Sequence, residues 1–174
     1  YSFIQEMTRR GKKSFGFVGE ELHCQSFWER HMAFHDAMYL LKQPYKEEYC
    51  MLGNKEGVEN PGSAEYQEYL TECFQKLDKL PEILICANDF VALDTLQVLR
   101  KLGYSVPEDV CICGFDDSPE SKIIDPSLTT IHIHSQIMGF SAVHLLMSRI
   151  KNPSLNYRTM YTETSLIYRK STGD

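Results

Sequence analysis

The chain has no excess of basic residues: 18 Lys and Arg stand against 24 Asp and Glu, which gives a formal net charge of −6. Nucleic-acid binding depends largely on clustered Lys and Arg, so this balance argues against direct contact between these 174 residues and DNA or RNA. Any DNA contact is therefore expected from a segment outside this sequence.

Long apolar runs are also absent. No stretch approaches the roughly 20 apolar residues that a membrane helix requires, and no apolar segment behind a basic start indicates a signal peptide. The length allows one sizeable domain with its own core, and hydrophobic and charged fractions of 43% and 24% are typical of a globular protein. We expect a soluble protein with no membrane partner.

Paired cysteines of the C-x-x-C type are missing, which argues against a structural zinc site. Four of the six cysteines fall inside apolar runs, where a free cysteine behaves as a small buried hydrophobe. This pattern favours a reduced, cytoplasmic setting. The six are Cys24, Cys50, Cys73, Cys86, Cys111 and Cys113.

The histidine pattern predicts no metal site and no cofactor. His31 and His35 stand one helical turn apart, but no H-E-x-x-H motif accompanies them, so both are expected at the surface. His132 and His134 point to the same side of an expected strand, yet no third ligand is evident near them in the sequence.

What the sequence does contain is a strand-helix-strand unit between residues 83 and 117. Two short apolar runs, 83–87 and 110–114, each end on polar residues, and apolar residues at helical spacing lie between them and close on Gly103. The unit predicts an α/β fold with a mainly parallel sheet and a right-handed crossover. Ligands of such sheets bind beyond the carboxyl ends of the strands, where Asn88, Asp89, Asp116 and Asp117 are expected.

The rest of the chain continues this alternation. Helices are expected at 1–10, 25–42, after Ser63 and at 136–150, strands at 14–18, 48–52 and 128–133, and an extended tail at 157–168. Ser63 and Ser135 are expected helix caps. Residues 53–62 and the polar segment 118–125 are expected to be loops.

Several motifs occur in order along the chain: C-A-N-D at 86–89, V-P-E-D-V at 106–110, G-F-D-D at 114–117, P-x-L-T-T at 126–130 and G-x-x-A at 139–142. Together they resemble the effector-binding domain of the lactose-repressor (LacI/GalR) transcription regulators. The likeness runs along essentially the whole chain and thins between residues 53 and 62.

This resemblance implies a three-layer αβα fold of the type I periplasmic-binding-protein-like class, largely the second lobe of a two-lobed domain. Residues 1–174 would form a single partial effector-binding domain, without the DNA-binding headpiece and most of the first lobe. Residues 134–150 would belong with the first lobe.

The resemblance also implies a function. A small sugar or related metabolite would bind between two lobes and modulate operator affinity through the headpiece, in a cytoplasmic homodimer. The dimer surface to inspect is formed by residues 97–102 and 118–125.

One alternative is a sugar-binding protein of a transport system. Another is an enzyme with Asp116 and Asp117 on Mg²⁺, but no Gly-rich phosphate loop or paired Lys supports it, so we expect no catalysis.

Asp116 and Asn88 are the leading candidates for effector contact. Strand alternation predicts Asp116 on the face opposite Cys113 and Phe115, where its carboxylate could accept two hydroxyl hydrogen bonds; the alternative is that it only caps a turn. The Asn88 amide can both donate to and accept from one hydroxyl, whereas Asp89 is expected to cap the next helix. Asp117 is expected to be a turn residue.

Arg30 and Trp28 complete the candidate site. Residues 26–30 match the family's S-x-x-x-R stretch, which implies that the forked guanidinium of Arg30 reaches ligand oxygens. Trp28 could stack on a pyranose face, or it could be a core aromatic. The chain has Asn54 and Lys55 where family members often carry an aromatic residue, so the effector's identity stays open.

Overall fold

A computed structural model describes residues 1–53 and 61–174. Four parallel strands form the central sheet in the order β2-β1-β3-β4, which confirms the parallel α/β prediction. They are β1 (Phe15–Val18), β2 (Cys50–Met51), β3 (Ile83–Cys86) and β4 (Cys111–Cys113). Most of the expected loop 53–62, with Asn54 and Lys55, lies outside the described residues.

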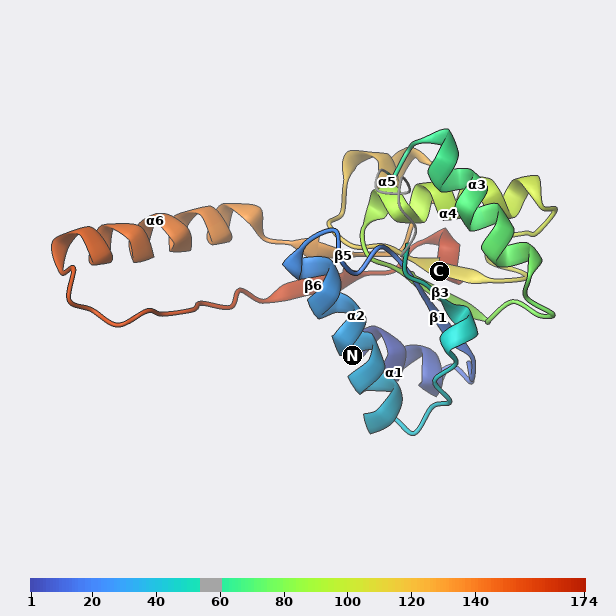
Figure 1. Ribbon diagram of the computed structural model, residues 1–174, viewed down its shortest axis with the longest axis horizontal. Coiled ribbons are helices and arrows are strands. Elements are labelled where there is room, and N and C mark those ends of the chain that lie inside the picture. The colour runs from blue at the N-terminus through green and yellow to red at the C-terminus, as the bar shows by residue number, and fades with distance from the viewer. Residues whose placement is uncertain (54–60) are drawn as a thin grey trace.

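Helices cover both faces of this sheet, so the expected three layers are present. Figure 1 shows α1 and α2 on one face and α3 and α4 on the other. Their bounds are α1 (Ser2–Arg9), α2 (Gln25–Leu40), α3 (Ala64–Gln75) and α4 (Asp89–Lys101). Strands with helices on both sides must be apolar throughout, which is why β1 and β4 consist of buried residues along their whole length.

The cysteines follow the burial that their neighbours predict. All six are free, and Cys86, Cys111 and Cys113 are buried within β3 and β4. Cys24 is exposed in the loop after β1. The buried thiols pack as small apolar side chains in the layer between the sheet and its helices.

Two of the smaller elements differ from expectation. The predicted strand 48–52 is reduced to β2, because a short 3₁₀ helix, η1 (Glu47–Tyr49), precedes it. The polar segment 118–125 is not simply a loop. It contains the short helix α5 (Pro119–Ile123), whose Ser118 hydroxyl accepts a hydrogen bond from the Ser121 amide at 3.3 Å.

A second, two-stranded sheet leaves the core. β5 (Thr130–Ile133) pairs antiparallel with β6 (Thr164–Ile167), and Ile133 lies opposite Thr164. We call this pair the ribbon and residues 135–163, which it carries, the arm. Figure 1 shows the arm projecting far from the sheet core.

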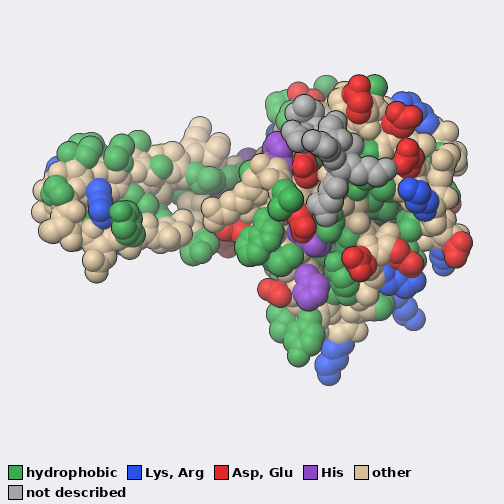
Figure 2. Space-filling model, viewed as in Figure 1, with side chains coloured by type: hydrophobic (Ala, Val, Ile, Leu, Met, Phe, Trp, Pro, Cys, Tyr) green, Lys and Arg blue, Asp and Glu red, His purple; other side chains and the backbone are tan. Residues whose placement is uncertain are grey.

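The arm begins with α6 (Ser135–Lys151), and none of the residues of this helix is buried. Seven of its large hydrophobic side chains are 46% to 75% exposed. They are Ile137, Met138, Phe140, Val143, Leu146, Met147 and Ile150. Figure 2 shows hydrophobic side chains gathered over this projection. The predicted Ser135 cap is wrong, because Ser135 is already the first helical residue and no side-chain cap bond precedes it.

The far end of the chain returns to the core at η2 (Lys170–Thr172). The Ser171 hydroxyl donates to the Ile112 carbonyl at 2.7 Å and accepts from the Thr129 amide at 2.8 Å. Ser171 is completely buried, so this segment closes the β4 side of the sheet. No helix among residues 1–53 and 61–174 is long and apolar enough to span a membrane.

Candidate functional site

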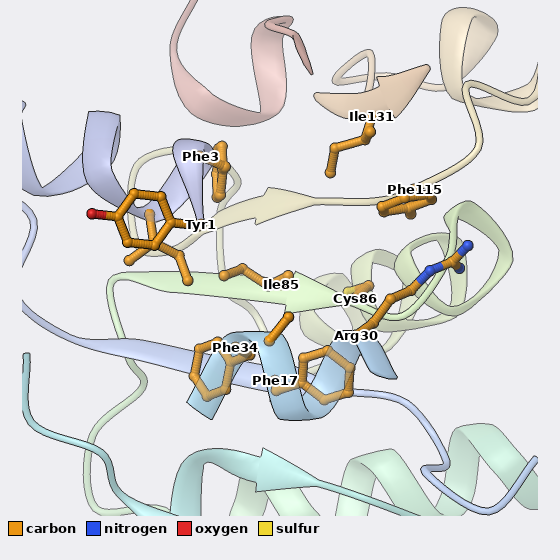
Figure 3. A pocket seen from close by; sticks show the side chains of 11 residues that line it. Tyr1, Phe3, Phe17, Arg30, Phe34, Ile85, Cys86, Phe115 and Ile131 are labelled. Atoms are coloured by element: carbon orange, nitrogen blue, oxygen red, sulfur yellow. The ribbon is translucent and has the colours of Figure 1, made fainter. Parts of the chain in front are cut away.

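The carboxyl ends of β3 and β4 meet the side chain of Arg30, which comes from α2. Arg30 Nη1 donates to the Ala87 carbonyl at 2.6 Å, and Nη2 lies 3.4 Å from Asp116 Oδ1. The guanidinium carbon is 3.7 Å from the centroid of the Phe115 ring. Figure 3 shows Arg30 and Phe115 side by side at the rim of a pocket. The structure therefore brings together two of the predicted site residues, Arg30 and Asp116.

The expected alternation of Asp116 and Phe115 across the strand is wrong. β4 ends at Cys113, and Asp116 and Asp117 have positive φ angles of 113° and 57°. Positive φ breaks the pleat, so strand alternation does not extend to these residues. As a result Phe115 and Asp116 both contact the same guanidinium.

The charges of this pair are partly removed from water. Burial raises the pKa of the Asp116 carboxyl above its ordinary value, while the charge of Arg30 opposes that shift. Burial also lowers the pKa of Arg30. The side chains keep 21% (Arg30) and 37% (Asp116) of their surface exposed, so a ligand can still reach both. The arrangement offers a forked donor beside a carboxylate acceptor.

Asn88 caps α4, so the prediction that Asp89 performs this role is wrong. Asn88 Oδ1 accepts from the Val91 amide at 2.9 Å, and its backbone is extended, as an N-cap position requires. The cap occupies the side-chain oxygen. The amide NH₂ group is the part of Asn88 that remains suited to a ligand.

Asp89 is structural, as expected, but by a different mechanism. It is buried, with 1% of its surface exposed, and accepts from Thr130 Oγ1 at 2.6 Å and from the Ser118 amide at 2.7 Å. Burial raises the pKa of its carboxyl, and these hydrogen bonds oppose the rise. Asp89 thus joins the start of α4 to β5 and to the start of α5.

Asp117 does more than form a turn. Its carboxylate accepts from Arg169 Nη2 at 2.5 Å and lies 2.9 Å from His132 Nδ1 and 3.4 Å from Lys122 Nζ. Sequence reasoning missed Arg169, which is 52 residues from Asp117. No local sequence pattern predicts the contact between Asp117 and Arg169 across that separation.

Trp28 is 49% exposed, so the alternative that it is a core aromatic is wrong. At 3.6 residues per turn, a residue two positions from Arg30 lies about 200° around the helix axis. Trp28 therefore points away from the Arg30–Asp116 pair, and its contact with an effector stays a prediction.

The burial of His31 and His35 differs from the expectation that both lie at the surface. His31 is not at the surface: it is 4% exposed, and its Nδ1 lies 2.9 Å from Glu21 Oε2. The expected exposure of His35 is confirmed. His132 and His134 do share one side of β5, with ring centroids 4.9 Å apart. In the described part of the chain no three His, Cys, Asp or Glu residues gather closely enough to hold a metal ion.

Two hollows adjoin the Arg30–Asp116 pair. The first is an apolar pocket of about 120 Å³ with Arg30 and Phe115 at its rim and Phe17, Phe34 and Ile85 among its walls (Figure 3). The second, of about 690 Å³, lies between the Asp116–Asp117 turn and the first turns of α6. Asp116 therefore faces open space on the side of the arm, while Arg30 stands at the rim of the apolar pocket.

Comparison with known proteins places this geometry in a family. Residues 4–172 match the model of the periplasmic binding protein-like domain. The chain is 30% identical over 173 residues to the HTH-type transcriptional repressor PurR of Actinobacillus pleuropneumoniae serotype 3, covering 98% of this chain and 49% of that protein. The chain thus spans about half the length of the curated relatives that it matches.

Solved structures share the fold. The transcription regulator CcpA of Lactococcus lactis superposes with a TM-score of 0.78 at 21% identity, covering 99% of this chain and 60% of that one. A complex of the transcriptional regulator CelR with cellobiose gives a TM-score of 0.81 at 23% identity, covering 96% and 49%. With the family model matching almost from end to end, this chain belongs to the periplasmic binding protein-like domain family.

Proposed function

We propose that this chain is the effector-sensing region of a LacI/GalR-type transcriptional regulator that acts as a repressor. The observation that carries the proposal is the Arg30–Asp116 pair, which stands partly exposed at the carboxyl ends of β3 and β4, with Asp116 on the side of the arm. Effectors of open α/β domains bind at this edge. The repressor relative at 30% identity supports the same assignment.

The effector binds between two lobes, and the sheet core described above is the second lobe. The arm supports this arrangement, because a helix with seven exposed apolar side chains and no buried residue is suited to packing against further structure. The arm then belongs with the first lobe, and the ribbon is one of the connections between the lobes.

A small sugar or related metabolite fits the polar groups of the site. Asp116 can accept hydroxyl hydrogen bonds, Arg30 donates through a fork, and the Asn88 amide adds a donor. Trp28 is a further candidate contact. Bound effector changes DNA affinity only through its different affinity for the open and closed arrangements of the lobes.

The remaining partners follow from this assignment. Operator DNA is bound by a helix-turn-helix headpiece outside these 174 residues, in keeping with their net charge of −6. The regulator is a cytoplasmic homodimer that pairs through residues 97–102 and 118–125. It catalyses no reaction.

The natural gene tests the proposal first. An upstream coding sequence with a first lobe and a headpiece is expected; a signal peptide with a first lobe and no headpiece would instead make this an exported sugar-binding protein. Titration calorimetry of the natural protein against a panel of mono- and disaccharides, nucleobases and nucleosides then identifies the effector.

Two substitutions locate the effector site. Arg30→Ala and Asp116→Ala are each expected to weaken effector binding by at least about tenfold, because each removes a charge-assisted hydrogen bond. Arg9→Ala is the matched control, since the Arg9 side chain is 71% exposed on α1. Unchanged affinity in both site variants would place the effector elsewhere.

A further inference from the structure

The two carboxylates of the Asp116–Asp117 turn face different parts of the molecule. Asp116 lies beside Arg30 in the proposed effector site. Asp117 borders the same hollow as Asp116, but its side chain is only 5% exposed, and its partners are His132 of β5, Lys122 of α5 and Arg169, which follows β6. One peptide bond therefore separates a group that faces the cleft from a group that faces the connection to the arm.

The partners of Asp117 lie on the outgoing strand of the ribbon and just beyond its returning strand. His132 is in β5, on the outgoing strand, and its Nδ1 is 2.9 Å from Asp117 Oδ2. Arg169 follows the end of β6 by two residues and precedes η2, and its Nη2 donates to Asp117 Oδ1 at 2.5 Å. One carboxylate thus holds the two strands at the point where they leave the core.

The same cluster is attached firmly to the core. Arg169 Nη1 donates to the Leu128 carbonyl at 2.8 Å and to Ser121 Oγ at 3.1 Å. Lys122, in α5, approaches Asp117 Oδ2 at 3.4 Å. Because Arg169 is only 16% exposed and Asp117 5%, this ion pair is largely shielded from solvent.

The cluster is one of several contacts at the base of the ribbon, where Thr130 Oγ1 also donates to Asp89 at 2.6 Å and the Asp116 amide donates to the Ile131 carbonyl at 2.9 Å. β5 and β6 pair with each other and not with the main sheet, apart from two isolated bridges at Thr129 and His132. The arm beyond them has no buried residue in α6. An isolated two-stranded ribbon is only marginally stable, so contacts at its base must orient it.

We infer that Asp117 is a positioning residue whose carboxylate helps to set the direction of the ribbon and arm relative to the sheet core. If the proposed function holds, this direction is also the angle between the two lobes that grip the effector. Asp116 then contacts the effector while its neighbour fixes the geometry in which that contact is made.

Distance measurements on residues 1–174 test this without effector or DNA. Nitroxides are attached through a ketone-bearing amino acid at position 143 in α6 and position 68 in α3, both exposed in the structure, so that the native cysteines need not be changed. Pulsed electron–electron double resonance then gives the distribution of distances between the two labels, one on the core and one on the arm. In Asp117→Asn the width of this distribution is expected to be about twice that of the wild type.

Asp116→Asn is the matched control, because it makes the same chemical change one residue away, and its distribution is expected to equal the wild type. Hydrogen exchange at the β3 amides should be the same in all three proteins, which separates lost positioning from general unfolding. Equal widths in Asp117→Asn and wild type would overturn the inference.

His132→Gln keeps the test decisive if Asp117→Asn does not fold. His132 is 39% exposed, so its replacement leaves the core intact and removes one of the two ribbon contacts. A measurable but smaller broadening is expected, and an unchanged width would count against the inference. Because no effector or operator is used, a negative result here leaves the proposed function standing, and failure of the effector titration leaves this result standing.

Discussion

The guanidinium of Arg30 is stacked on the ring of Phe115, with 3.7 Å between the guanidinium carbon and the ring centroid. The same group donates to the Ala87 carbonyl at 2.6 Å. Two contacts that do not involve the effector therefore hold Arg30 in place, and its weaker approach to Asp116 at 3.4 Å leaves donor capacity for a ligand.

Arg30→Met and Phe115→Leu should therefore interact in a double-mutant cycle. A cation–π contact at a partly buried site contributes about 0.5–2 kcal/mol, and the free energies of urea unfolding should show a coupling of that size. Arg9→Met, on the surface of α1, is the control and should combine additively with Phe115→Leu. Additive behaviour of the Arg30 pair would show that the stacking contributes nothing.

Asn88 should contribute to stability through its cap. Asn88→Ala removes the acceptor of the Val91 amide and is expected to lower the free energy of unfolding by about 1 kcal/mol. Asn88→Asp keeps a capping oxygen and should stay close to the wild type. Urea unfolding of both variants checks this, and equal stability of the Ala and Asp variants would contradict it.

Gly114 is required by a close approach. A Cβ atom at this position would lie 2.2 Å from Asp89 Oδ1 and 2.9 Å from Leu128 Cδ2. Gly114→Ala should therefore cost about 1–3 kcal/mol, measured by thermal or urea unfolding. Gly139→Ala is the matched control, because Gly139 lies in α6 with nothing within 4 Å of its added Cβ, and it should raise helicity without loss of stability.

Asp117 should make the free energy of unfolding depend on pH in the acid range. Burial alone would raise the pKa of its carboxyl, but the bonds from Arg169 and His132 outweigh burial and hold that pKa below its ordinary value. Its contribution is complete above the unfolded-state value of about 3.9 and is lost as the pH falls through the lower folded-state pKa. The difference in unfolding free energy between wild type and Asp117→Asn should shrink below about pH 4.

Asp116 should change the free energy of unfolding with pH in the opposite direction to Asp117. Burial raises its pKa, so the folded state disfavours its charge at neutral pH. The wild type should therefore gain stability relative to Asp116→Asn as the pH falls through that raised pKa. Urea unfolding of Asp116→Asn and Asp117→Asn across this pH range checks both predictions. If the stability difference from the wild type changed in the same direction for both variants, the opposite pKa shifts assigned to Asp116 and Asp117 would be contradicted.

The parallel sheet was predictable because its signals are local. Apolar runs at 83–87 and 110–114, each ending on polar residues, mark buried strands, and the helix between them follows from periodicity. The Arg30–Asp116 pair joins residues 86 positions apart, and only the resemblance to a known family placed them in one site.

Other features of the site had no such signal. Which of Asn88 and Asp89 caps α4 depends on the backbone angles at the end of β3, and either residue type can cap. His31, by contrast, carried a signal in its spacing: it lies on the same buried face of α2 as Phe27 and Phe34, and its ring centroid is 5.2 Å from that of Phe17. The Asp117–Arg169 pair depends on the path of the arm out of the core and back.

Closure of the sheet by Ser171 also has a consequence for folding. Ser171 bonds to the Ile112 carbonyl from 59 residues further along the chain, so the edge of β4 beside Ile112 stays uncovered until that later segment has docked, whereas Thr129 bridges the end of the strand at Cys113. Contacts of such long range slow folding, and an uncovered strand edge is a template for pairing with other chains. Until η2 has docked, a newly made chain of this protein therefore leaves part of this strand edge available to other chains.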